Sequence, residues 1–307
     1  MSVIVVTGGF GYVGGRVVRE FMNNGAEVRV ATRRTHNAIP SWAGNAVRFS
    51  SDVAALADGA DCLIHLAAPN EIICAAAPEK AIADTVALTQ SAIDAARAGG
   101  VGRVIYFSTV HVYGPLQGHI DETTPAAPQS PYAEAHLLSE DIVQAAAGPD
   151  LQALTLRLSN GFGAPADTGT DRWSLLINDL CRQAVRERTL TLKSGGQQMR
   201  DFLPLTDVAR AARHAASAAV PPGVYNLSSG KSTSIRAMAE LILYRARQFL
   251  GDDIALVAPS IAPGPNPEML TIENHRLGAT GFHPKTDPAD EIDALLRFCR
   301  DADAPKR

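Results

Sequence analysis

The stretch TGGFGYVG, Thr7 to Gly14, follows the apolar run VIVV and precedes a segment whose apolar residues have helical spacing. Gly8, Gly11 and Gly14 are spaced as GxxGxxG, and Gly9, Gly11 and Gly14 also fit GxGxxG. Glycines here permit a tight turn and let the backbone approach a pyrophosphate, which the amides of a helix N-terminus can bind. Because the motif stands between a strand and a helix, it predicts a dinucleotide site.

The segments around this motif predict the fold class. Short β-rich runs alternate with helical patterns as far as Arg157, and these runs are VIVVTGG, EVRVAT, AVRFS, DCLIHLAA, GRVIYFST and LQALTLRL. Strands that are apolar throughout are buried on both faces, which is typical of a parallel sheet covered by helices. We therefore expect a doubly wound α/β fold with a Rossmann-type sheet in residues 1–158. Residues 159–307 are expected to form mainly a smaller C-terminal substrate-binding lobe, with a strand near 223–229 returning to the sheet.

Composition narrows the class of protein. The chain has 307 residues, of which 46% are hydrophobic, and a net charge of -4, so it can bury a substantial core. It has no basic run of the kind that binds nucleic acid or an anionic membrane, and no apolar segment of about 18 residues. These features predict a cytoplasmic protein with small-molecule partners. The four cysteines have no CxxC spacing, which predicts buried free thiols and no metal site.

The end of the second predicted strand indicates which dinucleotide is bound. NAD sites usually place an acidic side chain there for the ribose hydroxyls, whereas this sequence reads VATRR, with Arg33 and Arg34 last. Adjacent guanidinium groups suit a 2'-phosphate, although they could also be solvated surface charges. We expect NADP(H) rather than NAD.

The chain resembles the extended short-chain dehydrogenase/reductase family, in particular its nucleotide-sugar epimerase, dehydratase and ketoreductase branch. The likeness rests on TGGFGYVG, Asp52-Val53, LIHLAA (63–68), STVHVYG (108–114), SPYAEAHLLSE (130–140), RLSNGFG from 157, QMRDFLPLTDVARA from 197 and GVYNLSSGKSTSIRAMAELI from 223. The cofactor-binding residues expected from it, together with Arg33 and Arg34, are Gly8, Gly11, Tyr12, Val13, Gly14, Asp52, Val53, Leu66, Ala67, Ala68, Tyr132 and His136. The resemblance also implies a homodimer.

The resemblance assigns roles in the substrate site as well. Thr109 matches the Ser or Thr that hydrogen-bonds the substrate oxygen, and Tyr132 matches the catalytic tyrosine. Asn160 matches a residue near the sugar diphosphate, and Arg200 matches an arginine that grips the diphosphate. The alternative for Arg200 is a structural ion pair with Asp201.

One departure from the family argues against dehydration. Dehydratases of this branch carry an Asp-Glu pair directly after the catalytic Thr, whereas this chain has Val110 and His111. His111 is a candidate second catalytic acid and substrate-binding residue, because its position faces the sugar in the family. The alternative is that His111 only binds or packs.

A second departure concerns His136. In the family a lysine four residues after the tyrosine holds the nicotinamide ribose and lowers the tyrosine pKa, but no lysine lies between residues 81 and 192 here. His136 keeps the helical spacing, yet a histidine with a pKa near 6.5 carries its charge only conditionally. Reduction needs Tyr132 only as an acid, whereas oxidation needs it as a base.

These features together favour NADP(H)-dependent reduction of a nucleotide-linked 4-keto sugar to a (deoxy)sugar nucleotide, with Tyr132 as proton donor. The alternative is a nucleotide-sugar 4-epimerase with tightly bound NAD(P). A third possibility, from another class, is a catalytically impaired NADP-binding protein. The loops at 160–172 and 257–270 are expected to select the nucleotide and the sugar.

Overall fold

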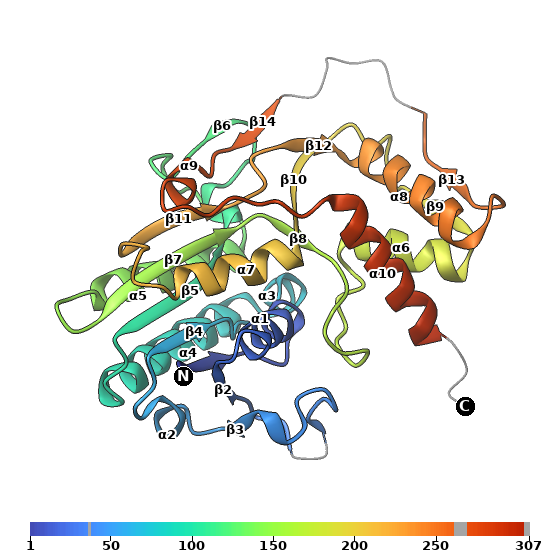
Figure 1. Ribbon diagram of the computed structural model, residues 1–307. Coiled ribbons are helices and arrows are strands. Elements are labelled where there is room, and N and C mark those ends of the chain that lie inside the picture. The colour runs from blue at the N-terminus through green and yellow to red at the C-terminus, as the bar shows by residue number, and fades with distance from the viewer. Residues whose placement is uncertain (36–37, 261–268, 304–307) are drawn as a thin grey trace.

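The computed structural model describes residues 1–35, 38–260 and 269–303, and its largest element is a parallel sheet (Figure 1). The sheet has seven strands in the order β11-β7-β5-β4-β1-β2-β3. Every neighbouring pair is parallel. The strands are β1 (Val3–Thr7), β2 (Glu27–Ala31), β3 (Arg48–Ser50), β4 (Cys62–His65), β5 (Arg103–Thr109), β7 (Gln152–Leu158) and β11 (Gly223–Leu227).

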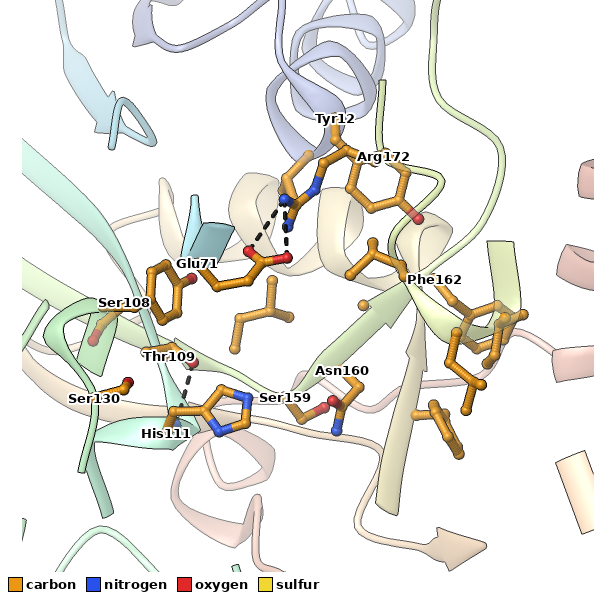
Figure 2. A pocket seen from close by; sticks show the side chains of 18 residues that line it. Tyr12, Glu71, Ser108, Thr109, His111, Ser130, Ser159, Asn160, Phe162 and Arg172 are labelled. Atoms are coloured by element: carbon orange, nitrogen blue, oxygen red, sulfur yellow. Dashed lines mark hydrogen bonds and ion pairs between the residues drawn. The ribbon is translucent and has the colours of Figure 1, made fainter. Parts of the chain in front are cut away.

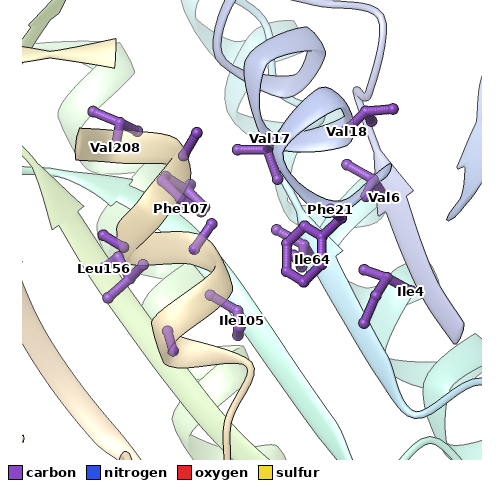
Figure 3. Close-up of a cluster of buried hydrophobic side chains, with 14 of the residues drawn as sticks. Ile4, Val6, Val17, Val18, Phe21, Ile64, Ile105, Phe107, Leu156 and Val208 are labelled. Carbon is purple, nitrogen blue, oxygen red and sulfur yellow. The ribbon is translucent and has the colours of Figure 1, made fainter. Parts of the chain in front are cut away.

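Helices cover both faces of this sheet. On one face lie α1 (Tyr12–Asn23) and α7 (Leu205–Ala215), whose apolar side chains pack on the strands as Figure 3 shows. On the other lie α2 (Val53–Ala57), α4 (Pro78–Ala98) and α5 (Pro131–Ala146). All seven residues of β5 are buried, which explains why this strand is apolar without alternation. The expected doubly wound α/β fold is confirmed.

A second hydrophobic core lies beyond the carboxyl ends of the strands. It is built by α6 (Leu176–Arg186), α8 (Ile235–Leu250) and α10 (Pro288–Asp303), with β9 (Thr189–Thr191) and β13 (Ala255–Val257) paired at its edge. A three-stranded sheet of β8 (Asn160–Phe162), β10 (Met199–Pro204) and β12 (Ser232–Ser234) connects it to the large sheet. Two smaller strands, β6 (Gly118–Ile120) and β14 (Leu270–Ile272), pair beside α9 (His275–Gly278) (Figure 1).

The chain crosses between these two parts more than once. Strand β11 lies at the edge of the large sheet beside β7, although it follows α7 and precedes the helices of the second core. Arg16 of α1 donates to the Ala164 carbonyl and to Glu291 of α10, and so ties the parts together. The division at residue 158 stays a prediction.

The described residues also bear on two expectations from composition. Cys62, Cys74, Cys181 and Cys299 are buried free thiols, as expected. Among the helices in the described ranges, none combines the length and apolarity needed to cross a membrane.

Candidate active site

A cavity of about 400 Å³ lies at the carboxyl ends of the central strands, between the large sheet and the second core (Figure 2). This is where an open α/β sheet binds ligands. The residues that line the cavity are Tyr12, Val13, Glu71, Ser108, Thr109, His111, Ser130, Tyr132, Leu158, Ser159, Asn160, Gly161, Phe162, Arg172, Leu175, Leu176, Ile177 and Phe202.

The glycine-rich turn has the geometry that a pyrophosphate requires. Gly8 has a φ of 68°, in the left-handed region, and a Cβ there would meet the Leu66 backbone at 2.9 Å. A Cβ on Gly14 would overlap the Gly8 carbonyl oxygen. Only glycine therefore lets β1, the turn and the start of α1 pack this closely, and Tyr12 and Val13 begin that helix at the edge of the cavity. The turn can hold a dinucleotide with its pyrophosphate on the N-terminus of α1.

The end of β4 forms the second wall of this turn. Thr7 accepts hydrogen bonds from the backbone N–H groups of Leu66 and Ala67, at 3.2 and 3.3 Å. These bonds hold the predicted cofactor segment, which ends at Ala68, against the glycine turn.

The residues predicted for the adenosine end lie away from the cavity. Arg33 and Arg34 are exposed after β2, and Arg34 donates to the Phe10 carbonyl oxygen of the glycine turn at 3.2 Å. Asp52 accepts from the Ala55 amide as the N-cap of α2 and, with Val53, lines a separate surface hollow between α2 and α4. Arg34 therefore lies at the glycine turn. Asp52, by contrast, also stabilises the fold as the N-cap of α2.

Thr109 and Tyr132 meet in the cavity because β5 ends where α5 begins. Thr109 is the last residue of β5 and accepts from the His111 amide at 3.2 Å. Tyr132 lies in the first turn of α5, which Ser130 caps by accepting from Ala133. The pKa of Tyr132 is raised to about 12, mainly by burial and next by the negative charge of Glu71, while a hydrogen bond with Thr109 lowers it.

His136 lies one helical turn after Tyr132 and is buried beneath it. The ring edge of His136 packs against the Tyr132 ring at a centroid distance of 4.5 Å. Its Nδ1 atom is 2.6 Å from the Tyr106 hydroxyl of β5. Burial, followed by the charges of His65 and His111, lowers the pKa of His136 to about 3. The charge that looked conditional from sequence is therefore absent across the neutral range.

His111 and Asn160 line the far side of the cavity (Figure 2). Burial lowers the pKa of His111, and the nearby Arg200 lowers it further. Asn160 donates to the Asp201 carbonyl oxygen at 2.8 Å. Arg200 itself is half-buried and is not among the residues that line the cavity.

The alternative role of Arg200 can be compared with the contacts of Asp201. The buried Asp201 carboxylate accepts from the Ser159 hydroxyl at 2.6 Å and from the Ser229 hydroxyl at 2.7 Å. In the ranges that the structure describes, no ion pair joins it to Arg200, whose guanidinium contacts the Met199 carbonyl oxygen. Arg200 therefore stays available to a ligand.

Sequence reasoning missed the ion pair between Glu71 and Arg172. Glu71 is the first residue of α3 (Glu71–Ala76), and Arg172 lies in the loop after β8. Their side chains meet across the cavity at 3.2 Å, as Figure 2 shows. A single acid three residues after the apolar stretch LIHLAA was a signal for Glu71, whereas nothing in the sequence around Arg172 marks it.

The fold and the cavity define a Rossmann-type protein with a threonine–tyrosine pair at the end of its central strand. Residues 4–228 match the family described as NAD dependent epimerase/dehydratase family, and the chain belongs to it. It is an enzyme of the extended short-chain dehydrogenase/reductase class.

Individual relatives are more distant. The chain is 29% identical over 303 residues to a UDP-glucose 4-epimerase of Corynebacterium glutamicum, covering 91% of each chain. It is 29% identical over 255 residues to a dTDP-6-deoxy-L-talose 4-dehydrogenase (NAD(P)(+)) of Kitasatospora kifunensis, covering 78% of each. Among solved structures, MoeE5 in complex with UDP-glucose and NAD matches with a TM-score of 0.80 at 24% identity, covering 98% of this chain and 99% of that one.

Proposed function

We propose that this enzyme reduces a nucleotide-linked 4-keto sugar with NADPH and that Tyr132 donates the proton. The observation that supports this most is the neutral His136, which leaves Tyr132 a phenol with a pKa raised to about 12. NADPH, when bound, supplies the hydride to the carbonyl carbon. The carbonyl oxygen takes the Tyr132 proton, which the phenolate regains from solvent, so the products are the alcohol and NADP⁺.

The other residues of the cavity bind and orient the substrate. The Thr109 hydroxyl, hydrogen-bonded with Tyr132, would donate to the carbonyl oxygen and polarise it. Arg200 and Asn160 would bind the diphosphate, for which a planar guanidinium is well suited. His111 is proposed as a substrate-binding residue, because its lowered pKa keeps it neutral and able to donate one hydrogen bond.

The high pKa of Tyr132 does not by itself set the direction of the reaction. The equilibrium constant is fixed, so at a given pH the loss of a cation slows oxidation and reduction by the same factor. Reduction of a ketone by NADPH has a favourable equilibrium at neutral pH, so it tolerates a slower proton transfer. An epimerase must oxidise its sugar in every turnover, and at pH 7 only about one phenol in 10⁵ with a pKa near 12 is ionised, or about one in 10³ once the bound nicotinamide cation lowers the pKa to about 10. The neutral His136 is therefore more compatible with a reductase.

The preference for NADPH rests on Arg34. Its guanidinium is held at the glycine turn by the Phe10 carbonyl, and no acidic residue ends β2 to accept ribose hydroxyls. The similarity to a dehydrogenase described with NAD(P)(+) agrees with a dinucleotide site of this kind.

The second candidate is a nucleotide-sugar 4-epimerase. It is favoured by the similarity to the Corynebacterium glutamicum UDP-glucose 4-epimerase, which covers 91% of both chains. Two incubations distinguish the reductase from the epimerase. One contains NADPH and a dTDP- or UDP-linked 4-keto sugar, and the other contains the corresponding hydroxyl sugar. We expect stoichiometric NADPH consumption with a keto sugar. Formation of the 4-epimer of a hydroxyl sugar without net cofactor change would refute the reductase.

We also propose that two copies associate through α4 and α5. Each helix exposes a leucine: Leu88 of α4 is 37% exposed and Leu138 of α5 is 41% exposed. Light scattering after size exclusion should give a dimer mass for the wild type and a monomer mass for the double variant Leu88→Glu/Leu138→Glu; a monomeric wild type would contradict the proposal.

A further inference from the structure

A buried cluster of polar rings and hydroxyls lies behind the catalytic tyrosine, and two of its members, Tyr106 and His65, have no role in the chemistry above. Tyr106, in the middle of β5, stacks on His65 at a centroid distance of 5.6 Å and approaches the His136 ring at 5.8 Å. Tyr106, His65 and His136 are 1%, 2% and 5% exposed. Polar groups this deeply buried need partners, so the direction of each hydrogen bond is constrained.

The contact between Tyr106 and His136 can be made in two directions. Either the Tyr106 hydroxyl donates to Nδ1, which leaves the ring proton on Nε2, or Nδ1–H donates to the Tyr106 oxygen, which leaves Nε2 bare. The separation of 2.6 Å between the two atoms is a short hydrogen bond, nearer to the usual length for a hydroxyl donor, about 2.7–2.8 Å to oxygen, than to that for an N–H donor, about 2.9–3.0 Å. Burial also raises the pKa of Tyr106 well above 10, so its hydroxyl keeps its proton.

The surroundings of Tyr106 support the same direction. Ser139, three residues after His136 in α5, accepts from the Thr89 hydroxyl at 3.0 Å, which leaves the Ser139 proton for the Tyr106 oxygen that gives its own proton to His136. His65 cannot compete for that proton, because its Nδ1 and Nε2 atoms are taken by Thr7 at 2.7 Å and Thr89 at 3.2 Å. The buried cluster is then fully paired while the His136 proton is on Nε2.

The Nε2 atom of His136 has a different situation. Within the residues that the structure describes, it makes no hydrogen bond, while its ring packs edge-on against Tyr132. In the family the lysine at this position holds the nicotinamide ribose, and we assign the same side of the cofactor to Nε2 of His136. A ribose hydroxyl can accept from an N–H at Nε2 as it would from an ammonium group, but without a charge.

We propose that Tyr106 is a positioning residue that fixes His136 in its Nε2–H tautomer and so makes this neutral histidine a permanent hydrogen-bond donor to the cofactor ribose. The inference rests on the cofactor site of the proposed function, but not on which sugar is bound or on the direction of the reaction. It explains how a histidine at the position of the family's lysine can keep the binding role while giving up the charge.

The tautomer can be measured without substrate. In protein with ¹⁵N-labelled histidine, at pH 7 with and without NADPH, we expect the His136 Nδ1 signal at the position of an unprotonated acceptor nitrogen and Nε2 at that of a protonated one. His136→Gln identifies the signals among the eight histidines of the chain. Tyr106→Phe should give a mixture of tautomers. A wild-type ring with its proton on Nδ1, or a charged ring, would overturn the proposal.

Cofactor affinity provides the functional readout. NADPH titration by fluorescence should show about 5- to 10-fold weaker binding to Tyr106→Phe, the effect of about one net hydrogen bond. Tyr225→Phe is the matched control, because Tyr225 is also buried in the sheet and donates to a backbone carbonyl at 2.8 Å, away from the cavity. Its NADPH affinity should equal that of the wild type.

A double-mutant cycle separates this role from a purely structural one. The amide nitrogen of Gln takes the place of Nε2, always carries protons and needs no tautomer to be fixed. Tyr106→Phe should therefore weaken NADPH binding in the wild type and have no further effect in the His136→Gln background. Equal effects of Tyr106→Phe in both backgrounds would reduce Tyr106 to a packing residue. If NADPH binds tightly and the cycle behaves as expected but no keto sugar is reduced, the proposed function fails and the role of Tyr106 stands.

Discussion

Replacing His136 by lysine restores a cation next to Tyr132 and tests the electrostatics of the site. The His136 ring lies 4.5 Å from the Tyr132 ring, centroid to centroid, so an ammonium group there would lie about 5 Å from the phenol oxygen. At an effective dielectric constant of about 20 this is worth about 3 kcal/mol, or about two pKa units. Burial of the ammonium reduces this figure, so two units is the upper end of the expected shift.

The shift should be visible in the pH dependence of oxidation. The phenol has a pKa of about 12 in the ligand-free protein, and the cationic nicotinamide of NADP⁺ should lower it in the complex by an amount similar to that of a lysine. We expect log kcat/KM for the hydroxyl sugar to rise with pH and to level near pH 10 in the wild type and near pH 8 in His136→Lys. His136→Gln, which is neutral, should follow the wild type.

The rates should change by the same factor in both directions. Weakening a base by two units while ionising more of it gives a net gain of about 5-fold in oxidation at pH 8, if proton transfer is about half complete in the transition state. Reduction at pH 8 should gain the same factor, because the stronger acid protonates the alkoxide faster. An unshifted bend in His136→Lys, or a wild-type reduction rate that titrates near pH 6.5, would refute the reasoning.

Four further predictions concern single residues. Glu71→Gln removes the negative charge that raises the Tyr132 pKa, so the bend in the oxidation profile should move to lower pH by up to about one unit; a move to higher pH would contradict the assignment. Arg34→Ala should weaken NADPH about 10-fold or more and leave NADH within about 2-fold in a direct titration; equal losses would remove the 2'-phosphate role. Arg200→Ala should raise KM for the nucleotide sugar about 10- to 100-fold with unchanged NADPH affinity, and an unchanged KM would exclude Arg200 from diphosphate binding. His65 has a pKa lowered to about 4 by burial, so the folded state loses stability as pH falls from about 6.5 towards 4; urea unfolding of His65→Asn should show a pH dependence smaller by about 2 to 3 kcal/mol, and an unchanged dependence would show that other groups cause it.

The sequence predicted the fold well because local and long-range signals agree in it. Each strand of the large sheet is a short apolar run buried on both faces, and the glycines of the first turn allow only one kind of packing. The return of the strand near 223–229 to the large sheet was expected, whereas the order of the strands in space and the three-stranded sheet around β10 depend on contacts between distant segments. Those contacts leave no periodic mark in the sequence.

The site was predictable where neighbouring residues form a motif. The spacing of Tyr132 and His136 on one helix brought both to the same place, beside Thr109. The contact of His136 with Tyr106 joins α5 to a strand 30 residues earlier. The sequence shows only the residue type and spacing of His136, and these predict a cation that depends on pH. Burial and the buried partners of His136, which only the structure shows, keep it neutral. Glu71 was missed for the same reason, since its importance comes from its place across the cavity.

The charges around Tyr132 indicate whether this side chain acts as an acid or as a base. An enzyme that relies on a phenolate gains from every nearby cation, yet here the neighbouring histidine is neutral and the charge with the largest effect on the pKa of Tyr132 is the negative Glu71. Arg172 offsets part of that charge, but it is paired with Glu71 and is a weaker influence on Tyr132 than Glu71 is. A neutral donor at His136 still binds the ribose without drawing the proton from the phenol. The site thus separates two functions that one lysine combines, and it keeps the one that a proton-donating tyrosine needs.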